Sequence, residues 1–212
     1  MRVASATTCR PSRPRANTWT DLSKLMQNNP RNLANIDTPA AIVSLQRMQR
    51  NITRMQQRAN ALGVRFRPHV KTSKCANVVA AQLDAGAAGI TVSTLKEADE
   101  FFGRGVSDIL YAVGMAPHRL PHALDLRQRG CALQILTDSV EGARAIAEYG
   151  REHGHVFEVL IEIDTDGHRS GIKPAEDVLL EVGRVLHEGG MRLAGVLTHA
   201  GSSYELRTPE AR

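Results

Sequence analysis

The feature of this sequence that most restricts its fold is an alternation of short β-branched runs with amphipathic stretches, which begins near residue 36. Between Leu45 and Leu62, apolar residues recur at intervals of three and four. This spacing predicts one face of a helix, and Gly63 is well placed to end it. The runs FEVLIEID and RLAGVLTHA are apolar enough to be buried on both faces, as parallel strands are. The alternation therefore predicts an α/β fold with a parallel sheet.

The same pattern gives the extent of the expected elements. Strands are expected at residues 40–45, 66–70, 89–94, 108–113, 132–138, 157–164 and 192–200, and further helices at 75–85, 95–103, 117–129, 140–153 and 174–189. No Gly-x-Gly-x-x-Gly follows the first strand, so a (β/α)8 TIM-type barrel fits better than a dinucleotide-binding fold. If 40–45 lies outside the barrel, about six barrel strands remain. We therefore expect an incomplete barrel and a truncated chain.

The net charge of +5 originates in the N-terminal segment. Residues 1–35 hold six basic residues and one acid, whereas the rest of the chain has 21 of each. We expect 1–35 to be a basic, disordered tail and 36–212 to be the folded domain, although residues 1–20 also have the composition of an organelle transit peptide. A neutral body with 4% aromatic residues argues against nucleic-acid binding.

Two further classes of protein are not expected. No apolar run approaches the roughly 18–20 residues that a membrane-spanning helix needs. The three cysteines are widely spaced and form no CxxC pair, which argues against a disulfide framework and a structural zinc site. The cytoplasm is therefore the expected location.

Polar side chains gather at the expected strand ends, where a barrel enzyme has its active site. Lys71 directly follows the expected strand at 66–70. A lysine at the mouth of a barrel strand is well placed to form a Schiff base. The alternative is a solvated surface lysine, which is what most lysines are.

A second candidate lies in the segment DTDGHRSG at residues 164–171. Gly167 allows a tight turn that fixes Arg169, and a planar, permanently charged guanidinium suits an anionic oxygen or a ring nitrogen. The alternative is a structural ion pair between Asp164 and Arg169.

The end of the last expected strand adds a third group. Gly201, Ser202 and Ser203 offer backbone amides and hydroxyls that suit a phosphate, although a plain Ser/Gly turn would look the same. His199 suits a metal ligand, a base, a stacking surface or a structural role.

Taken in order, six segments resemble the D-threonine aldolase and D-serine dehydratase family. They are DTPAAIV, RPHVKTSK, GITVSTLKEAD, DILYAVG, IEIDTDGHRSG and GVLTHAGSSY, and they cover about residues 36–205. That family belongs to the alanine-racemase-like, fold-type III enzymes that use pyridoxal phosphate. The resemblance implies that Lys71 holds the cofactor covalently, that Arg169 contacts its ring and that the His199 imidazole lies against the pyridine. It also implies that Gly201, Ser202, Ser203 and Tyr204 lie near the phosphate and ring, and that His69 borders the same pocket.

The resemblance also implies an activity. It is that of a lyase on 3-hydroxy D-amino acids, either an aldolase that yields glycine and an aldehyde or a dehydratase. A non-catalytic pyridoxal-phosphate-binding barrel and an amino-acid racemase are the alternatives. Family members are typically homodimers with a C-terminal β-domain that binds a divalent metal, and neither that domain nor its ligands are in this chain. Ser73 and Ser202 stand where the family often has histidine, which weakens any role for those two positions.

Overall fold

The computed structural model describes residues 38–208. The chain divides into two units, Met1–Ala40 and Ala41–Arg212, and every helix and strand described below belongs to the second. The basic tail expected at residues 1–35 lies outside the described residues. None of the helices in the described part of the chain has both the length and the apolar character needed to cross a membrane.

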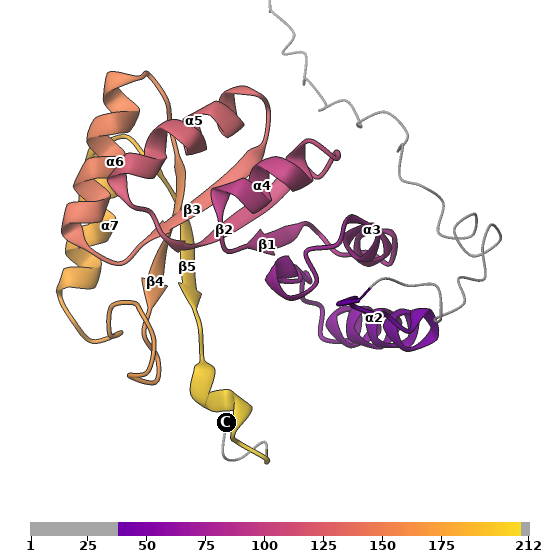
Figure 1. The fold of residues 1–212 in the computed structure, drawn as a ribbon. Coiled ribbons are helices and arrows are strands. Elements are labelled where there is room, and N and C mark those ends of the chain that lie inside the picture. Colours follow the sequence, from indigo (N-terminus) through magenta and orange to yellow (C-terminus); the bar gives the residue numbers. More distant parts are fainter. Residues whose placement is uncertain (1–37, 209–212) are drawn as a thin grey trace, which may run out of the picture. The chain divides into compact units, whose positions relative to one another are not determined.

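One parallel sheet organises the second unit (Figure 1). Its strands are β1 (Ile90–Val92), β2 (Asp108–Gly114), β3 (Ala132–Thr137), β4 (Glu158–Ile163) and β5 (Arg192–Thr198). They pair in sequence order, β1-β2-β3-β4-β5, and every pairing is parallel. Sequential order with a helix in each crossover is the arrangement of a (β/α) barrel rather than of a doubly wound sheet. The sheet is therefore that of an incomplete (β/α) barrel.

The described part of the chain has six α-helices and three short 3-10 turns, of which α4, η3, α5, α6 and α7 connect the strands. The helices are α2 (Leu45–Ala61), α3 (Ala76–Asp84), α4 (Leu95–Phe102), α5 (Leu120–Gln128), α6 (Val140–Glu152) and α7 (Val178–Glu188). The 3-10 turns are η2 (Val70–Thr72), η3 (Pro117–Arg119) and η4 (Gly201–Tyr204). Side-chain caps begin α4 and α6: the Thr94 hydroxyl accepts from the Glu97 amide, and the Ser139 hydroxyl accepts from the Gly142 amide.

The core lies between the sheet and its helices. On β4, Ile161 faces α7, since a Cβ built on Gly183 would lie 3.8 Å from Ile161 Cδ1. Side chains alternate along a strand, so Glu158 and Glu162 point to the opposite, inner face of the sheet. Fully buried side chains from both layers fill the core, among them Phe157, Ile135, Ile146 and Leu186.

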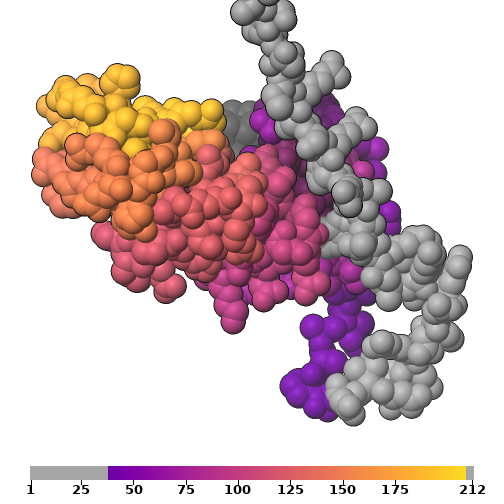
Figure 2. Space-filling model, turned by 90° about the horizontal axis from the view of Figure 1, so that it is seen from above, coloured from indigo at the N-terminus to yellow at the C-terminus, as the bar shows by residue number. Residues whose placement is uncertain are grey.

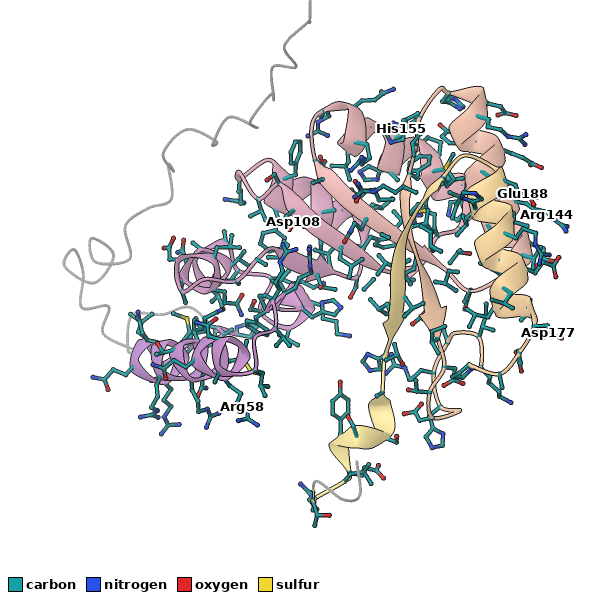
Figure 3. The ribbon with its side chains drawn as sticks, turned by 180° about the vertical axis from the view of Figure 1, so that it is seen from behind. Arg58, Asp108, Arg144, His155, Asp177 and Glu188 are labelled. Carbon is teal, nitrogen blue, oxygen red and sulfur yellow. The ribbon has the colours of Figure 1, made fainter. Side chains whose placement is uncertain are left out.

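Helices α6 and α7 pack side by side and are joined at their surface by an ion pair. Arg144 Nη2 of α6 lies 3.7 Å from Glu181 Oε1 of α7, and Figure 3 shows Arg144 on the outer side of this helix pair. In the space-filling view, the segments follow one another in chain order from magenta through orange to yellow, as the strands do (Figure 2). Strand β5 is exposed along most of its length, with Leu193 46% and Val196 63% exposed. It forms an edge of the sheet.

The two N-terminal strands of the prediction are wrong. Residues 41–44 have no regular structure, and helix α2 begins at Leu45. Ile42 and Val43 are 67% and 56% exposed, so this β-branched run packs against too little to act as a strand. Residues 66–70 run along β1, where two backbone hydrogen bonds and a single bridge from His69 to Thr91 hold them. Pro68 has no amide to donate, and no ladder forms. The described sheet has five strands rather than six.

Candidate functional site

The polar residues that follow the strands meet at the carboxyl ends of the sheet, the edge toward which the β4 and β5 arrows point in Figure 1. His69 and Lys71 come from the segment beside β1, Ser93 follows β1 and Asp138 follows β3. The segment 164–171 follows β4, and residues 199–204 follow β5. We call this set of loops the mouth of the barrel. It is the place where a barrel enzyme carries its chemistry.

Lys71 lies in η2, with its side chain exposed at the mouth. Its backbone amide donates to His69 Nδ1 at 3.5 Å, and His69 Nε2 lies 3.4 Å from Ser93 Oγ. The parallel bridge between His69 and Thr91 ties the same segment to β1. The backbone that carries Lys71 is therefore fixed to the sheet, while its amine stays accessible.

His69 is half-buried beside Lys71. Burial, and then the nearby Lys71 charge, lower the pKa of His69, and the charge of His199 acts in the same direction. Glu97 and a hydrogen bond to the Thr91 backbone oppose this only in part. The imidazole is therefore neutral at pH 7, and one of its nitrogens is able to accept a proton.

The segment 164–171 is folded back on β4. Asp164 Oδ1 accepts from the amides of Asp166 and Gly167, at 3.3 and 2.8 Å. Ile172 then returns to the strand: its amide donates to the Glu162 carbonyl, and its carbonyl accepts from the Asp164 amide. Asp164 is thus occupied in building the turn. Within residues 38–208 it forms no ion pair with Arg169, contrary to the structural alternative considered above.

Arg169 reaches from this loop toward the end of β5. A Cβ built on Gly201 would lie 3.7 Å from Arg169 Cγ and 3.8 Å from Cδ, so the aliphatic stem passes over that glycine. Arg169 is exposed, and no carboxylate in the described part of the chain lies within ion-pair distance of its guanidinium.

Backbone amides of the loop Gly201–Tyr204 are already hydrogen-bonded within the protein. The Gly201 amide donates to the His199 carbonyl, the Ser203 amide donates to the Ala200 carbonyl, and the Ser202 amide donates to Asp166 Oδ2 at 2.7 Å. Hydrogen bonds from Ser202 hold the pKa of Asp166 at about 2. An internal carboxylate therefore takes the amide that was predicted to face a phosphate, and the phosphate role of this loop stays a prediction.

His199 stands between these groups. Its ring lies 6.0 Å from the Tyr204 ring in an edge arrangement at 77°. Its charge lowers the pKa of both His69 and Glu162. The structure thus brings His69, Lys71, Arg169 and His199 to one mouth, although they lie up to 130 positions apart in the chain.

Glu162 is a member of the mouth that the sequence analysis did not select. It is 6% exposed, on the inner face of β4, and its Oε2 has no hydrogen-bond partner. Burial raises the pKa of its carboxyl, and the charge of Asp138 adds to this. A hydrogen bond with Ser170 and the charges of His199 and Arg169 oppose it. In the sequence, Glu162 could have been recognised as a glutamate within the apolar run FEVLIEI.

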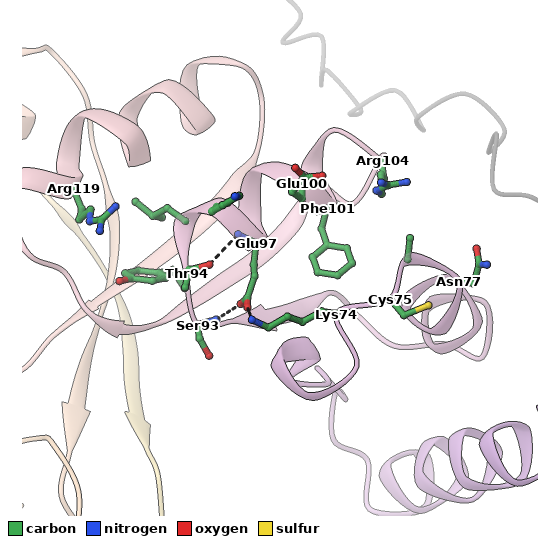
Figure 4. A pocket seen from close by; sticks show the side chains of 14 residues that line it. Lys74, Cys75, Asn77, Ser93, Thr94, Glu97, Glu100, Phe101, Arg104 and Arg119 are labelled. Carbon is green, nitrogen blue, oxygen red and sulfur yellow. Dashed lines mark hydrogen bonds and ion pairs between the residues drawn. The ribbon is translucent and has the colours of Figure 1, made fainter. Parts of the chain in front are cut away.

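A large hollow of about 1040 Å³ lies beside the mouth, next to α4 and the start of α3 (Figure 4). Ser93 borders it, and Lys71 is not among its lining residues. Glu97 in its wall accepts from the Ser93 amide at 2.9 Å and pairs with Lys74 at 3.0 Å. Burial alone would raise the pKa of Glu97, but these partners hold it below its usual value. We place the candidate site at the mouth because the accessible amine lies there.

The donors at the mouth match the cofactor that the sequence suggested. An exposed amine suits an aldehyde, the free Arg169 cation suits an anionic oxygen, and the two imidazoles suit an aromatic ring. For a metal the donor set is poorer. Among residues 38–208, no three His, Cys, Asp or Glu side chains cluster closely enough to hold an ion.

Comparison with known proteins agrees with this fold. The sequence matches the family described as alanine racemase, N-terminal domain, over residues 43–212. It is 69% identical over 181 residues to the D-threo-3-hydroxyaspartate dehydratase of Delftia sp. (strain HT23), covering 84% of this chain and 47% of that protein. It is 29% identical over 197 residues to the D-serine dehydratase of Dictyostelium discoideum, covering 87% of this chain and 50% of that protein.

Solved structures give the same result. The D-threo-3-hydroxyaspartate dehydratase from Delftia superposes with a TM-score of 0.81 at 68% identity, over 84% of this chain and 47% of that one. A D-threonine aldolase from Filomicrobium marinum superposes with a TM-score of 0.76 at 28% identity, over 84% of this chain and 48% of that one. One structure of the hydroxyaspartate dehydratase is of a mutant in the metal-free form. The chain spans about half the length of the curated relatives it matches.

Proposed function

The chain belongs to the alanine racemase N-terminal domain family, and from this premise we propose that the protein is a pyridoxal-phosphate-dependent lyase of 3-hydroxy D-amino acids. The observation that carries the proposal is the meeting of Lys71, His69, Arg169 and His199 at one mouth. Three separate segments supply them, and the amine of Lys71 is the accessible one. Pyridoxal phosphate, when bound, supplies an electron sink for bonds at the α-carbon of an amino acid.

Each of these residues at the mouth has its own role in the proposal. Lys71 holds the cofactor covalently through its amine, because it is the lysine whose backbone is tied to β1 at the mouth. The Arg169 guanidinium binds an anionic oxygen of the cofactor or of the substrate. His199 supports the cofactor ring, and the neutral His69 is placed to accept a proton beside Lys71.

For the substrate we propose D-threo-3-hydroxyaspartate, and for the reaction a dehydration that gives a 2-oxo acid and ammonia. The support is that the identity to the dehydratase of that substrate is more than twice the identity to the D-serine dehydratase. Cleavage of the Cα–Cβ bond, as in a D-threonine aldolase, is the second candidate, favoured by the 0.76 TM-score to that enzyme. A divalent metal bound outside residues 38–208 and a homodimer belong to the same proposal.

The test is an assay of the full-length protein with pyridoxal phosphate and a divalent cation. D-threo-3-hydroxyaspartate, D-serine and D-threonine are supplied separately, and ammonia, 2-oxo acid, glycine and aldehyde are all measured. We expect 2-oxo acid and ammonia in equal amounts from the first substrate. Glycine and aldehyde in their place would favour the aldolase, and no product from any of the three would refute the lyase proposal.

A further inference from the structure

Glu162 is a charged residue in a place where a charge is unfavourable. It is the last inward-facing residue of β4 and is 6% exposed, and its Oε2 has no hydrogen-bond partner. Buried carboxylates are normally paired or fully hydrogen-bonded. An unpartnered buried oxygen at the mouth therefore indicates that a partner arrives when the site is in use.

Among the described residues, Glu158, on the same strand, has the ion-pair partners that Glu162 lacks. Glu158 is also on β4 and points to the same face, four residues earlier. Its Oε2 lies 2.6 Å from Arg192, and its Oε1 lies 3.5 Å from Arg127. The glutamate at the far end of the strand is thus fully paired, whereas the glutamate at the mouth is not.

The groups around Glu162 are few. Ser170 hydrogen-bonds its carboxyl, and the charges that act on it are Asp138 after β3, His199 after β5 and Arg169 in the loop after β4. Arg169 is the permanently charged cation among them, and it has no ion-pair partner among the described residues.

The loop fixes the relation between these two groups. Ile172 hydrogen-bonds to both Glu162 and Asp164, so residues 164–171 form a closed turn on the end of β4. Ser170, inside that turn, is bonded to the Glu162 carboxyl, and Arg169 is its direct neighbour. Pairing of the guanidinium with the carboxylate requires a rotation of the Arg169 side chain on this turn.

We propose that Glu162 is a positioning residue, whose carboxylate orients the Arg169 guanidinium toward the bound cofactor or substrate at the mouth. This rests on the proposed function, since it needs a ligand that Arg169 engages. A guanidinium has five donors in a rigid fork, so one edge is able to bind the carboxylate while the other faces the ligand. The buried acid then has its partner, and the arginine is no longer free to rotate.

A double-mutant cycle in the full-length protein tests this. The variants are Glu162→Gln, Arg169→Gln and the pair, with Glu158→Gln as the matched control on the same strand and face. Affinity for pyridoxal phosphate is measured by absorbance titration, and folding by thermal unfolding. We expect Glu162→Gln to weaken binding about ten- to hundredfold, the range for a lost charged hydrogen bond. In the Arg169→Gln background, we expect the same change to have little further effect.

Independent, multiplying losses would overturn the proposal, because a merely structural glutamate would act equally in both backgrounds. If Glu162→Gln does not fold, the Glu162 carboxyl is titrated by NMR in the wild type and in Arg169→Gln. Loss of the arginine raises its pKa if the two groups interact, and an unchanged midpoint refutes the interaction. Wild-type protein that binds no pyridoxal phosphate would instead count against the proposed function itself.

Discussion

Gly171 closes the turn that carries Arg169, and it has no room for a side chain. A Cβ built there would lie 2.5 Å from the Asp164 amide nitrogen and 2.6 Å from the Ile163 carbonyl carbon, both of them backbone atoms. Its φ of +123° is also a conformation that other residues rarely adopt. Gly167, in the same loop, has a φ of +73° but nothing within 4 Å of its Cβ position. Alanine substitutions at the two glycines therefore distinguish the cost of backbone strain from the cost of steric collision.

We predict that Gly171→Ala lowers the free energy of unfolding more than Gly167→Ala does. Positive φ costs an alanine about 1–2 kcal/mol at either position. Overpacking adds about 1–3 kcal/mol, and only Gly171 has that collision. The expected difference between the two variants is therefore about 1–3 kcal/mol.

Urea unfolding followed by circular dichroism measures the difference, with equal slopes for the variants as the check on two-state behaviour. Binding of pyridoxal phosphate gives a second readout, since the displaced turn carries Arg169. We expect weaker binding in Gly171→Ala and near-normal binding in Gly167→Ala. Equal stability of the two variants would refute the close packing of this turn on β4.

Three other predictions follow from single side chains. Exposed Cys75 should react with a thiol reagent at pH 8 in the native state. Buried Cys131, whose pKa burial raises to about 11, should react only on unfolding, and mass spectrometry showing equal rates would contradict this. The Asp166 pKa of about 2 lies below its ordinary 3.8, so its contribution to stability is complete above about pH 4 and is lost as the pH falls through about 2; an NMR midpoint at or above 3.8 would disprove it. Replacing Ser139 by Ala removes a 3.1 Å bond from the Gly142 amide and should lower the free energy of unfolding by about 1 kcal/mol, whereas an unchanged urea midpoint would argue against the cap.

Most of the fold from residue 89 onward could be predicted from the sequence. Strands β1, β3 and β4 are largely buried apolar runs, and helices α4, α6 and α7 have a periodic apolar face, so burial and pattern agree there. Strand β5 is the exception, because its apolar run lies exposed at the sheet edge. The expected helix at 174–189 begins later, at Val178, because residues 174–177 are exposed and lie before the apolar face begins. The expected strand at 40–45 is absent because β-propensity describes packing against neighbours and this segment is exposed. The expected strand at 66–70 is absent because Pro68 has no amide to donate to a ladder.

The site was harder to derive. Lys71, Arg169 and His199 stand out because their residue types are unusual at strand ends, and the structure brings them together. Glu162 gave only a weak signal, since its meaning depends on the partners that surround it. The hydrogen bond from the Ser202 amide to Asp166 joins residues 36 positions apart, and no pattern in the sequence predicts it.

We propose that Lys71 is the lysine that holds pyridoxal phosphate. Borohydride reduction of the full-length protein with pyridoxal phosphate, followed by peptide mass mapping, tests it most directly. Lys74 is the internal control, because it lies three positions away and is paired with Glu97. We expect a stable label on Lys71 that disappears in Lys71→Ala and persists in Lys74→Ala. A label on Lys74, or one spread evenly over the lysines, would contradict it.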